Sequence, residues 1–183
     1  AEALVRASSL DWTIFRPSVI FGRDDNFLNL FALLLKFVPV MFLASPDARF
    51  QPVFVEDVAA AFARSLDDLG AYGESYDLCG PRVYTLRELV ALVGAVTGHR
   101  RPIIGLNAPL SYLQALVLEL LPRKLMTRDN YYSMKIDNVS SQPFPFGIRP
   151  AAIEAVVPAY LGNDSPRARY RAYRDRARRS LGR

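Results

Sequence analysis

The sequence is poor in the residue types from which metal and redox sites are built. It has one cysteine, Cys79, and one histidine, His99, among 183 residues. One cysteine excludes an internal disulfide framework, and one histidine cannot form a histidine-based metal site by itself. Cys79 follows an expected strand, which favours a buried free thiol, and His99 lies at an expected helix end. The sequence therefore predicts no metal site.

Phosphate-binding glycine patterns and long hydrophobic runs are also absent. The ten glycines never take the spacing Gly-x-Gly-x-x-Gly, and no Gly-Lys-Ser/Thr loop occurs, so dinucleotide binding by this chain alone is not supported. The most apolar stretch, residues 27–43, has 17 residues and contains Asn29, Lys36 and Pro39. Such a stretch is short and poorly composed for a membrane span, and it favours a helix packed on a core.

Positive charge is concentrated at the end of the sequence. Residues 167–183 hold eight arginines and one aspartate, a charge of +7, and the preceding residues carry 15 Lys+Arg against 17 Asp+Glu. We expect one folded unit over residues 1–161, because 51% of the residues are apolar, and an arginine-rich terminal helix or tail over residues 162–183. The tail is interpreted as a solvated helix, as a contact with an acidic partner or an anionic membrane surface, or, least favoured, as a nucleic-acid contact.

The hydrophobic pattern predicts strand-then-helix alternation up to residue 98 and a more helical remainder, which is typical of an α/β fold with parallel strands. In the helix that begins at Glu56, we expect Val58, Phe62 and Leu66 to face inwards. Strands are expected at residues 12–15, 49–55, 75–79 and 102–106, and helices at 28–38, 56–66, 85–98, 109–121 and 151–161. The clearest helix start is Thr85, an N-cap with Glu88 three residues later, and Gly98 ends that helix.

A candidate binding site follows the first strand. That strand stops at Arg16–Pro17 and opens into a loop, and open α/β sheets bind ligands outside the carboxyl ends of their strands. Arg16 and Arg49 lie at strand ends, where each either faces an anionic ligand or pairs with a local carboxylate. Tyr131 and Lys135 have the Tyr-x-x-x-Lys spacing of a proton-transfer pair, but without a cofactor turn we interpret them as part of a surface helix.

Three segments, residues 16–22, 51–59 and 84–89, resemble the C-terminal half of extended short-chain dehydrogenase/reductases, the NAD-dependent epimerase/dehydratase group. Residues 127–130, 137–139 and 146–148 are more narrowly similar to bacterial relatives of the nucleotide-binding accessory subunit of respiratory complex I. The resemblance covers residues 1 to about 161. It implies the C-terminal part of a Rossmann-like fold, with few short strands, several packed helices and a helix-rich end.

The resemblance implies that the cofactor turn and any catalytic serine and Tyr-x-x-x-Lys lie upstream of Ala1, so we expect no catalytic residue in this chain. Pro17, Ser18 and Val19 would lie against the nicotinamide of NAD or NADP in the full-length protein, and this part alone would not hold the cofactor tightly. Arg16, Arg49 and Gln51 are the candidate substrate-binding residues. Sugar-nucleotide epimerases carry an Arg-Asp pair where this sequence has Phe50 and Gln51, which argues against a nucleotide-sugar substrate.

The favoured function is a structural or assembly role linked to respiratory NADH dehydrogenase. One alternative is an active NAD(P)-dependent epimerase, dehydratase or reductase on a sugar nucleotide or a small apolar substrate, lined by residues 27–43 and 110–121. Another is a module that binds an anionic surface or a partner through the tail. The expected partners are the missing N-terminal half, a second copy, and a respiratory complex or membrane surface, and the expected location is cytoplasmic or peripheral at the inner membrane.

Overall fold

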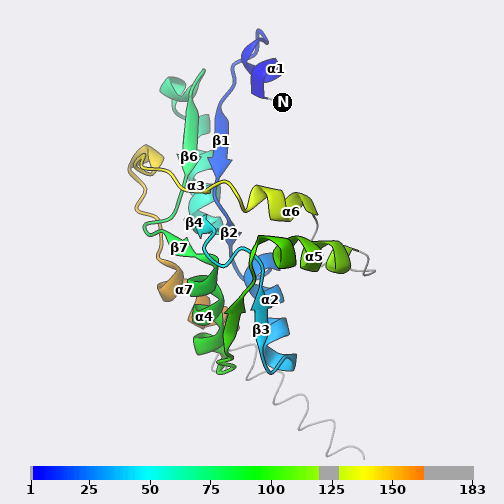
Figure 1. The fold of residues 1–183 in the computed structure, drawn as a ribbon. Coiled ribbons are helices and arrows are strands. Elements are labelled where there is room, and N and C mark those ends of the chain that lie inside the picture. Colours follow the sequence, from blue (N-terminus) through cyan, green and yellow to red (C-terminus); the bar gives the residue numbers. More distant parts are fainter. Residues whose placement is uncertain (1, 120–127, 163–183) are drawn as a thin grey trace, which may run out of the picture.

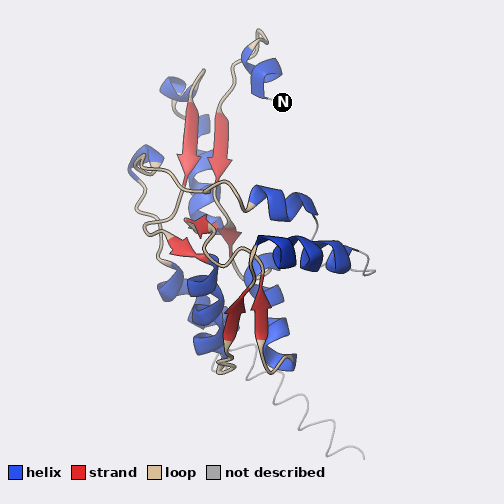
Figure 2. Cartoon of the chain, in the orientation of Figure 1, coloured by secondary structure: helices blue, strands red, loops and turns tan. Residues whose placement is uncertain are grey.

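The computed structural model describes residues 2–119 and 128–162, and it has short strands among longer helices (Figures 1 and 2). The helices are α1 (Glu2–Arg6), α2 (Asn26–Phe37), α3 (Val55–Leu66), α4 (Leu86–Thr97), α5 (Ala108–Glu119), α6 (Arg128–Ser133) and α7 (Ile153–Leu161), with 3-10 turns η1 (Leu69–Ala71) and η2 (Pro145–Gly147). The strands are β1 (Ile14–Pro17), β2 (Ile20–Phe21), β3 (Met41–Leu43), β4 (Arg49–Phe50), β5 (Val53–Phe54), β6 (Ser75–Leu78), β7 (Tyr84–Thr85) and β8 (Ile103–Gly105).

The strands form four pairs, of which three are parallel. β1 pairs with β6, β2 with β5 and β3 with β8 in parallel, and β4 pairs with β7 in antiparallel orientation. The β1–β6 register places Arg16 opposite Asp77. Parallel pairing joined by helices is the α/β arrangement that the sequence predicts. Pro52 separates β4 from β5, because proline cannot donate a ladder hydrogen bond.

The main core lies between α2, α4 and α7. α2 packs against α4, and α4 packs against α7. The predicted signals of α4 are confirmed: Thr85 and Glu88 form a capping box, and Gly98 ends the helix with φ 73°, a left-handed conformation that glycine adopts without strain. Asp25 caps α2 by accepting the Leu28 N–H at 2.6 Å. The apolar residues Leu86, Leu89, Val90 and Val93 of α4 are all buried.

The expected orientation of α3 is only partly right. Its buried residues are Val58, Ala61 and Ser65, whereas Phe62 is 50% exposed and Leu66 is 79% exposed. The small side chains of Ala61 and Ser65 lie on the buried face, and Phe62, although half exposed, packs on the ring of Phe15 in β1 with a centroid distance of 4.3 Å. We call Val55, Phe62 and Leu66 the outer stripe of α3.

The segment of residues 138–148, which we call the strap, crosses the carboxyl ends of β1 and β6; in Figure 1 it is the yellow chain that leaves α6. Phe146 has φ 57° and packs with Tyr76 at a ring-centroid distance of 5.0 Å. Its carbonyl accepts a hydrogen bond from Arg64 at 2.6 Å. Phe144, Phe146 and Ile148 extend a second, smaller core beneath the strands.

Candidate functional site

Ser18 begins the loop after β1 and is 5% exposed. Its Oγ donates to the Asn138 carbonyl at 3.0 Å and accepts the Gln51 N–H at 3.2 Å. The Gln51 side chain donates through Nε2 to the Gly80 carbonyl at 2.7 Å and accepts the Ser140 N–H at 3.0 Å. These bonds are within the chain itself, so the strap occupies the position outside β1 where the sequence places a ligand.

Gly80 is required for this arrangement. A Cβ at position 80 would lie 1.8 Å from the Pro52 carbonyl oxygen, closer than any real contact. The Gly80 N–H also donates to the Gln51 carbonyl at 3.1 Å. The close backbone approach therefore joins the loop after β6 to the β4–β5 segment.

Both candidate arginines pair with local carboxylates, which is one of the two alternatives that the sequence leaves open. Arg16 Nε donates to Glu2 at 2.9 Å, and its Nη1 lies 3.9 Å from Asp77. Arg49 Nη1 lies 3.6 Å from Asp137. Both side chains are about half exposed, so a ligand that reached them would compete with weak surface pairs.

Cys79 is a buried free thiol, as predicted. Burial raises the pKa of this thiol, and the nearby Asp77 carboxylate raises it further. A raised pKa keeps the sulfur protonated and unreactive at neutral pH. Asp77 also accepts a hydrogen bond from Ser140 Oγ at 2.8 Å. Cys79 therefore lacks the thiolate character of a nucleophile.

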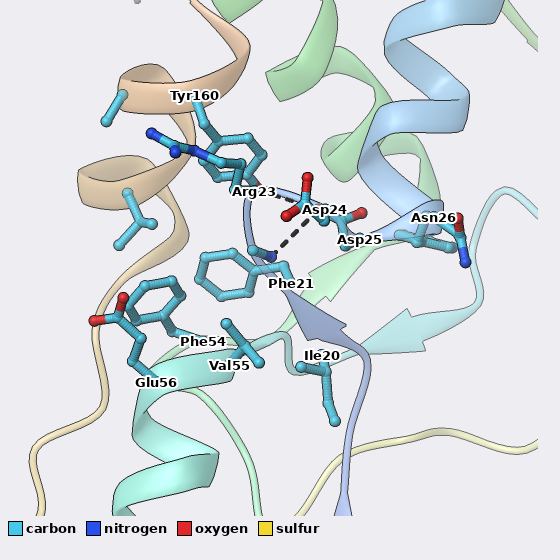
Figure 3. Close-up of a pocket in the computed structure, with 14 residues that line it drawn as sticks. Ile20, Phe21, Arg23, Asp24, Asp25, Asn26, Phe54, Val55, Glu56 and Tyr160 are labelled. Atoms are coloured by element: carbon cyan, nitrogen blue, oxygen red, sulfur yellow. Dashed lines mark hydrogen bonds between the residues drawn. The ribbon is translucent and has the colours of Figure 1, made fainter. Parts of the chain in front are cut away.

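A pocket of about 970 Å³ opens outside the carboxyl ends of β2 and β5 (Figure 3). Its wall combines the loop after β2, the start of α3 and the last turns of α7. Asp25 Oδ2 accepts the Gly22 N–H at 3.3 Å and the Tyr160 hydroxyl at 3.2 Å, the bonds drawn as dashed lines. Burial, together with Asp25, raises the pKa of Tyr160, so the phenol stays a hydrogen-bond donor. The charged residues of the wall are Arg23, Asp24, Asp25 and Glu56.

A groove of about 440 Å³ lies between α2, β3 and α5, with Met134, in the turn after α6, at its edge. Many of its lining residues belong to the apolar stretch of residues 27–43, which the sequence predicts to line a substrate site. Among the described side chains of the second expected stretch, residues 110–121, the one that lines the groove is Gln114, whose Nε2 donates to the Phe42 carbonyl at 3.0 Å.

The Tyr131–Lys135 pair does not have the geometry of a proton-transfer pair. The Tyr131 hydroxyl donates to the Ala108 carbonyl at 3.3 Å, and Lys135 Nζ lies over the ring of Tyr131 at 4.8 Å from its centroid. His99 Nδ1 is buried without a hydrogen-bond partner. In residues 2–119 and 128–162, no group of three His, Cys, Asp or Glu side chains is placed to hold a metal ion.

The strap is the part of the site that sequence reasoning missed. Asn138 and Ser140 contact residues 89 to 120 positions earlier in the chain, and no local pattern predicts such contacts. The sequence did carry one related signal, because residues 137–139 are similar to the accessory subunit. That similarity, however, assigns no role to Asn138. Residues 163–183, which make up all of the tail except its first residue, lie outside the described residues. No described helix has the length and apolar character of a membrane span.

No protein-family model matches the sequence. Among curated proteins, it is 37% identical over 97 residues to the NADH dehydrogenase [ubiquinone] 1 alpha subcomplex subunit 9 of Arabidopsis thaliana, covering 51% of this chain and 24% of that protein. It is 27% identical over 176 residues to the NADH-ubiquinone oxidoreductase 40 kDa subunit of Neurospora crassa, covering 92% of this chain and 46% of that protein. The resemblance to the accessory subunit is confirmed, and the chain spans less than half the length of these relatives.

Two solved structures show the fold. An NADPH-dependent quinone oxidoreductase of Escherichia coli, complexed with NADPH, is similar with a TM-score of 0.67 and 21% identity, over 87% of this chain and 56% of that one. A nucleoside-diphosphate-sugar epimerase of Staphylococcus aureus gives 0.61 and 16%, over 84% of this chain and 54% of that one. The predicted α/β fold of the Rossmann-like epimerase and reductase type is confirmed.

Proposed function

We propose that this chain is the substrate-side part of a longer NAD(P)-binding protein with a structural or assembly role in a respiratory NADH dehydrogenase. The similarity to the Neurospora crassa 40 kDa subunit carries the proposal, because it extends over 92% of the chain. In this proposal residues 1–161 pack against the rest of their own protein, which in turn contacts the respiratory complex. The protein would lie on the cytoplasmic side of the inner membrane, peripherally, with residues 162–183 as a candidate contact to its anionic surface.

The chemistry of the site agrees with a non-catalytic role for this chain. Ser18 and Gln51 already bond to each other and to the strap. Burial raises the pKa values of the Cys79 thiol and the Tyr160 phenol. Hydride transfer also needs the nicotinamide held in place. We propose that Pro17, Ser18 and Val19 contact the nicotinamide through atoms not used by the strap, once the remainder of the protein binds NAD or NADP.

The second candidate is an active NAD(P)-dependent epimerase, dehydratase or reductase. One observation favours it: the pocket of Figure 3 lies open outside the carboxyl ends of two parallel strands, where α/β enzymes bind their ligands. In this candidate function, the catalytic serine and tyrosine come from the rest of the longer protein.

One titration tests both candidates. The fluorescence of NADH and NADPH is followed on addition of this chain and, separately, of the longer protein. We expect that only the longer protein binds, and that it oxidises neither cofactor with carbonyl or sugar-nucleotide substrates. Turnover would establish the second candidate, and tight cofactor binding by the 183-residue chain would contradict both.

A further inference from the structure

The groove between α2, β3 and α5 is lined almost entirely by hydrocarbon. Leu30 and Leu34 come from α2, Met41 and Phe42 come from β3, and Met134 comes from the turn that follows α6. None of the described residues that line the groove is ionisable, and the polar ones are the amides Asn26 and Gln114. Gln114 is already bonded to the Phe42 carbonyl. The groove is therefore suited to an uncharged apolar group.

One end of the groove adjoins the pocket of Figure 3. Asn26 and Phe27 line both cavities, and Figure 3 places Asn26 at the first turn of α2. On the far side of that boundary the wall carries Asp24, Asp25 and Glu56 against the single positive charge of Arg23. An anion at this end of the groove would lie in a field of net negative charge, whereas an uncharged polar group could bond to the Asn26 amide, which both donates and accepts.

We propose that this groove binds the hydrocarbon chain of a lipid-like alcohol or another amphiphile whose polar end is uncharged, with the polar end at Asn26. Burial of each methylene of the chain favours binding, and the volume of about 440 Å³ lies in the range of small-molecule sites. The proposal goes beyond the proposed function, because it concerns binding by this chain alone and holds whether or not the longer protein catalyses a reaction.

Two variants separate the groove from the rest of the surface. Leu30 lines the groove and Leu33, on the same helix, is exposed on another face. Leu30→Gln places an amide in the groove, and Leu33→Gln makes the same change outside it. Phe42→Asn is a second groove variant at a half-exposed position, so the test does not depend on the folding of one variant. Cooperative thermal unfolding confirms that each variant is folded.

Equilibrium dialysis of the 183-residue chain measures the binding of three probes: dodecanol, farnesol and laurate. We expect one dodecanol or farnesol per chain, with laurate at least about tenfold weaker because of its charge. Leu30→Gln and Phe42→Asn should each weaken binding by about tenfold or more, and Leu33→Gln should change it by less than about twofold. Preference for dodecanol over farnesol would identify a linear chain, and the reverse an isoprenoid chain.

Three results would overturn the proposal. The first is the absence of saturable binding of either alcohol. The second is equal weakening by Leu33→Gln and Leu30→Gln, which would mean binding to the general surface. The third is a dimer that takes no alcohol but separates in Leu30→Gln, which would make a second copy of the chain the occupant of the groove.

Discussion

Ser18 and Gln51 are two of the polar side chains that hold the strap against the strands, together with Asp77 and Arg64. Ser18 and Gln51 each have a donor and an acceptor satisfied by backbone from another part of the chain. A buried hydroxyl contributes most to the stability of a protein when its removal would leave its hydrogen-bond partners unsatisfied. The side chain of Ser18, in the loop after β1, therefore serves stability.

We predict that Ser18→Ala lowers the free energy of unfolding by about 1–3 kcal/mol, because the Gln51 N–H and the Asn138 carbonyl lose their partner in a buried site. Urea unfolding followed by circular dichroism measures the change. Ser133→Ala, on the exposed side of α6, is the control and should change stability by less than about 0.5 kcal/mol. Equal stabilities of the two variants would show that the Ser18 bonds contribute little.

For single residues, the sequence predicts the chemical state of a side chain better than it predicts which other residues that side chain contacts. The buried thiol of Cys79 follows from its place after a strand, and the carboxylate pairing of Arg16 and Arg49 was one of two stated alternatives. The carbonyl to which Ser18 donates belongs to Asn138 in the strap, 120 residues away, and no local pattern carries that information.

The α4 start is the element whose local sequence decides its structure. Glu88 accepts the Thr85 N–H at 2.7 Å, while Thr85 Oγ1 accepts the Glu88 N–H at 3.2 Å. The hydrogen bond from the Thr85 backbone lowers the pKa of Glu88. α3 differs, because apolar residues lie on two of its faces. The sequence pattern therefore does not show which face is buried, and in the structure the buried face includes the small residues Ala61 and Ser65. The start of α4 was therefore predictable, whereas the rotation of α3 was not.

We predict that Glu88→Ala destabilises the protein by about 0.5–1 kcal/mol at pH 7, since it removes half of a capping box. A lowered folded-state pKa means that this contribution is present above the ordinary glutamate pKa of 4.5 and is lost as the pH falls through the lower folded value. The difference from wild type in thermal unfolding should therefore shrink between pH 5 and about pH 3. Glu56→Ala, which removes the same charge from the first turn of α3, is the control and should show a smaller effect at pH 7.

The outer stripe of α3 gives the whole molecule an exposed apolar face. Leu69, in η1 beside the end of α3, adds to it with 77% of its surface exposed. Contiguous apolar surface of this kind is typical of an interface. Under the function proposed above, the rest of the longer protein would cover this stripe, since the relatives are more than twice as long as the part they share with this chain.

We predict that the 183-residue chain associates weakly with itself through this face. Sedimentation velocity over a range of concentrations should show association that the double variant Leu66→Glu and Leu69→Glu weakens by about tenfold, equivalent to about 1.4 kcal/mol. Phe37→Glu, at an exposed apolar position on the end of α2, is the control and should leave association unchanged. A chain that stays monomeric at the highest concentration would contradict the prediction.

The strap also determines the order in which parts of the protein can fold during synthesis. Ser18, Gln51 and Asp77 are translated long before Asn138 and Ser140, so a nascent chain carries unmatched polar groups at the ends of its strands until residue 140 has left the ribosome. Contacts of such sequence separation delay folding, because a large loop must close before they form. The contacts of the strap with the ends of β1 and β6 are thus formed late in synthesis.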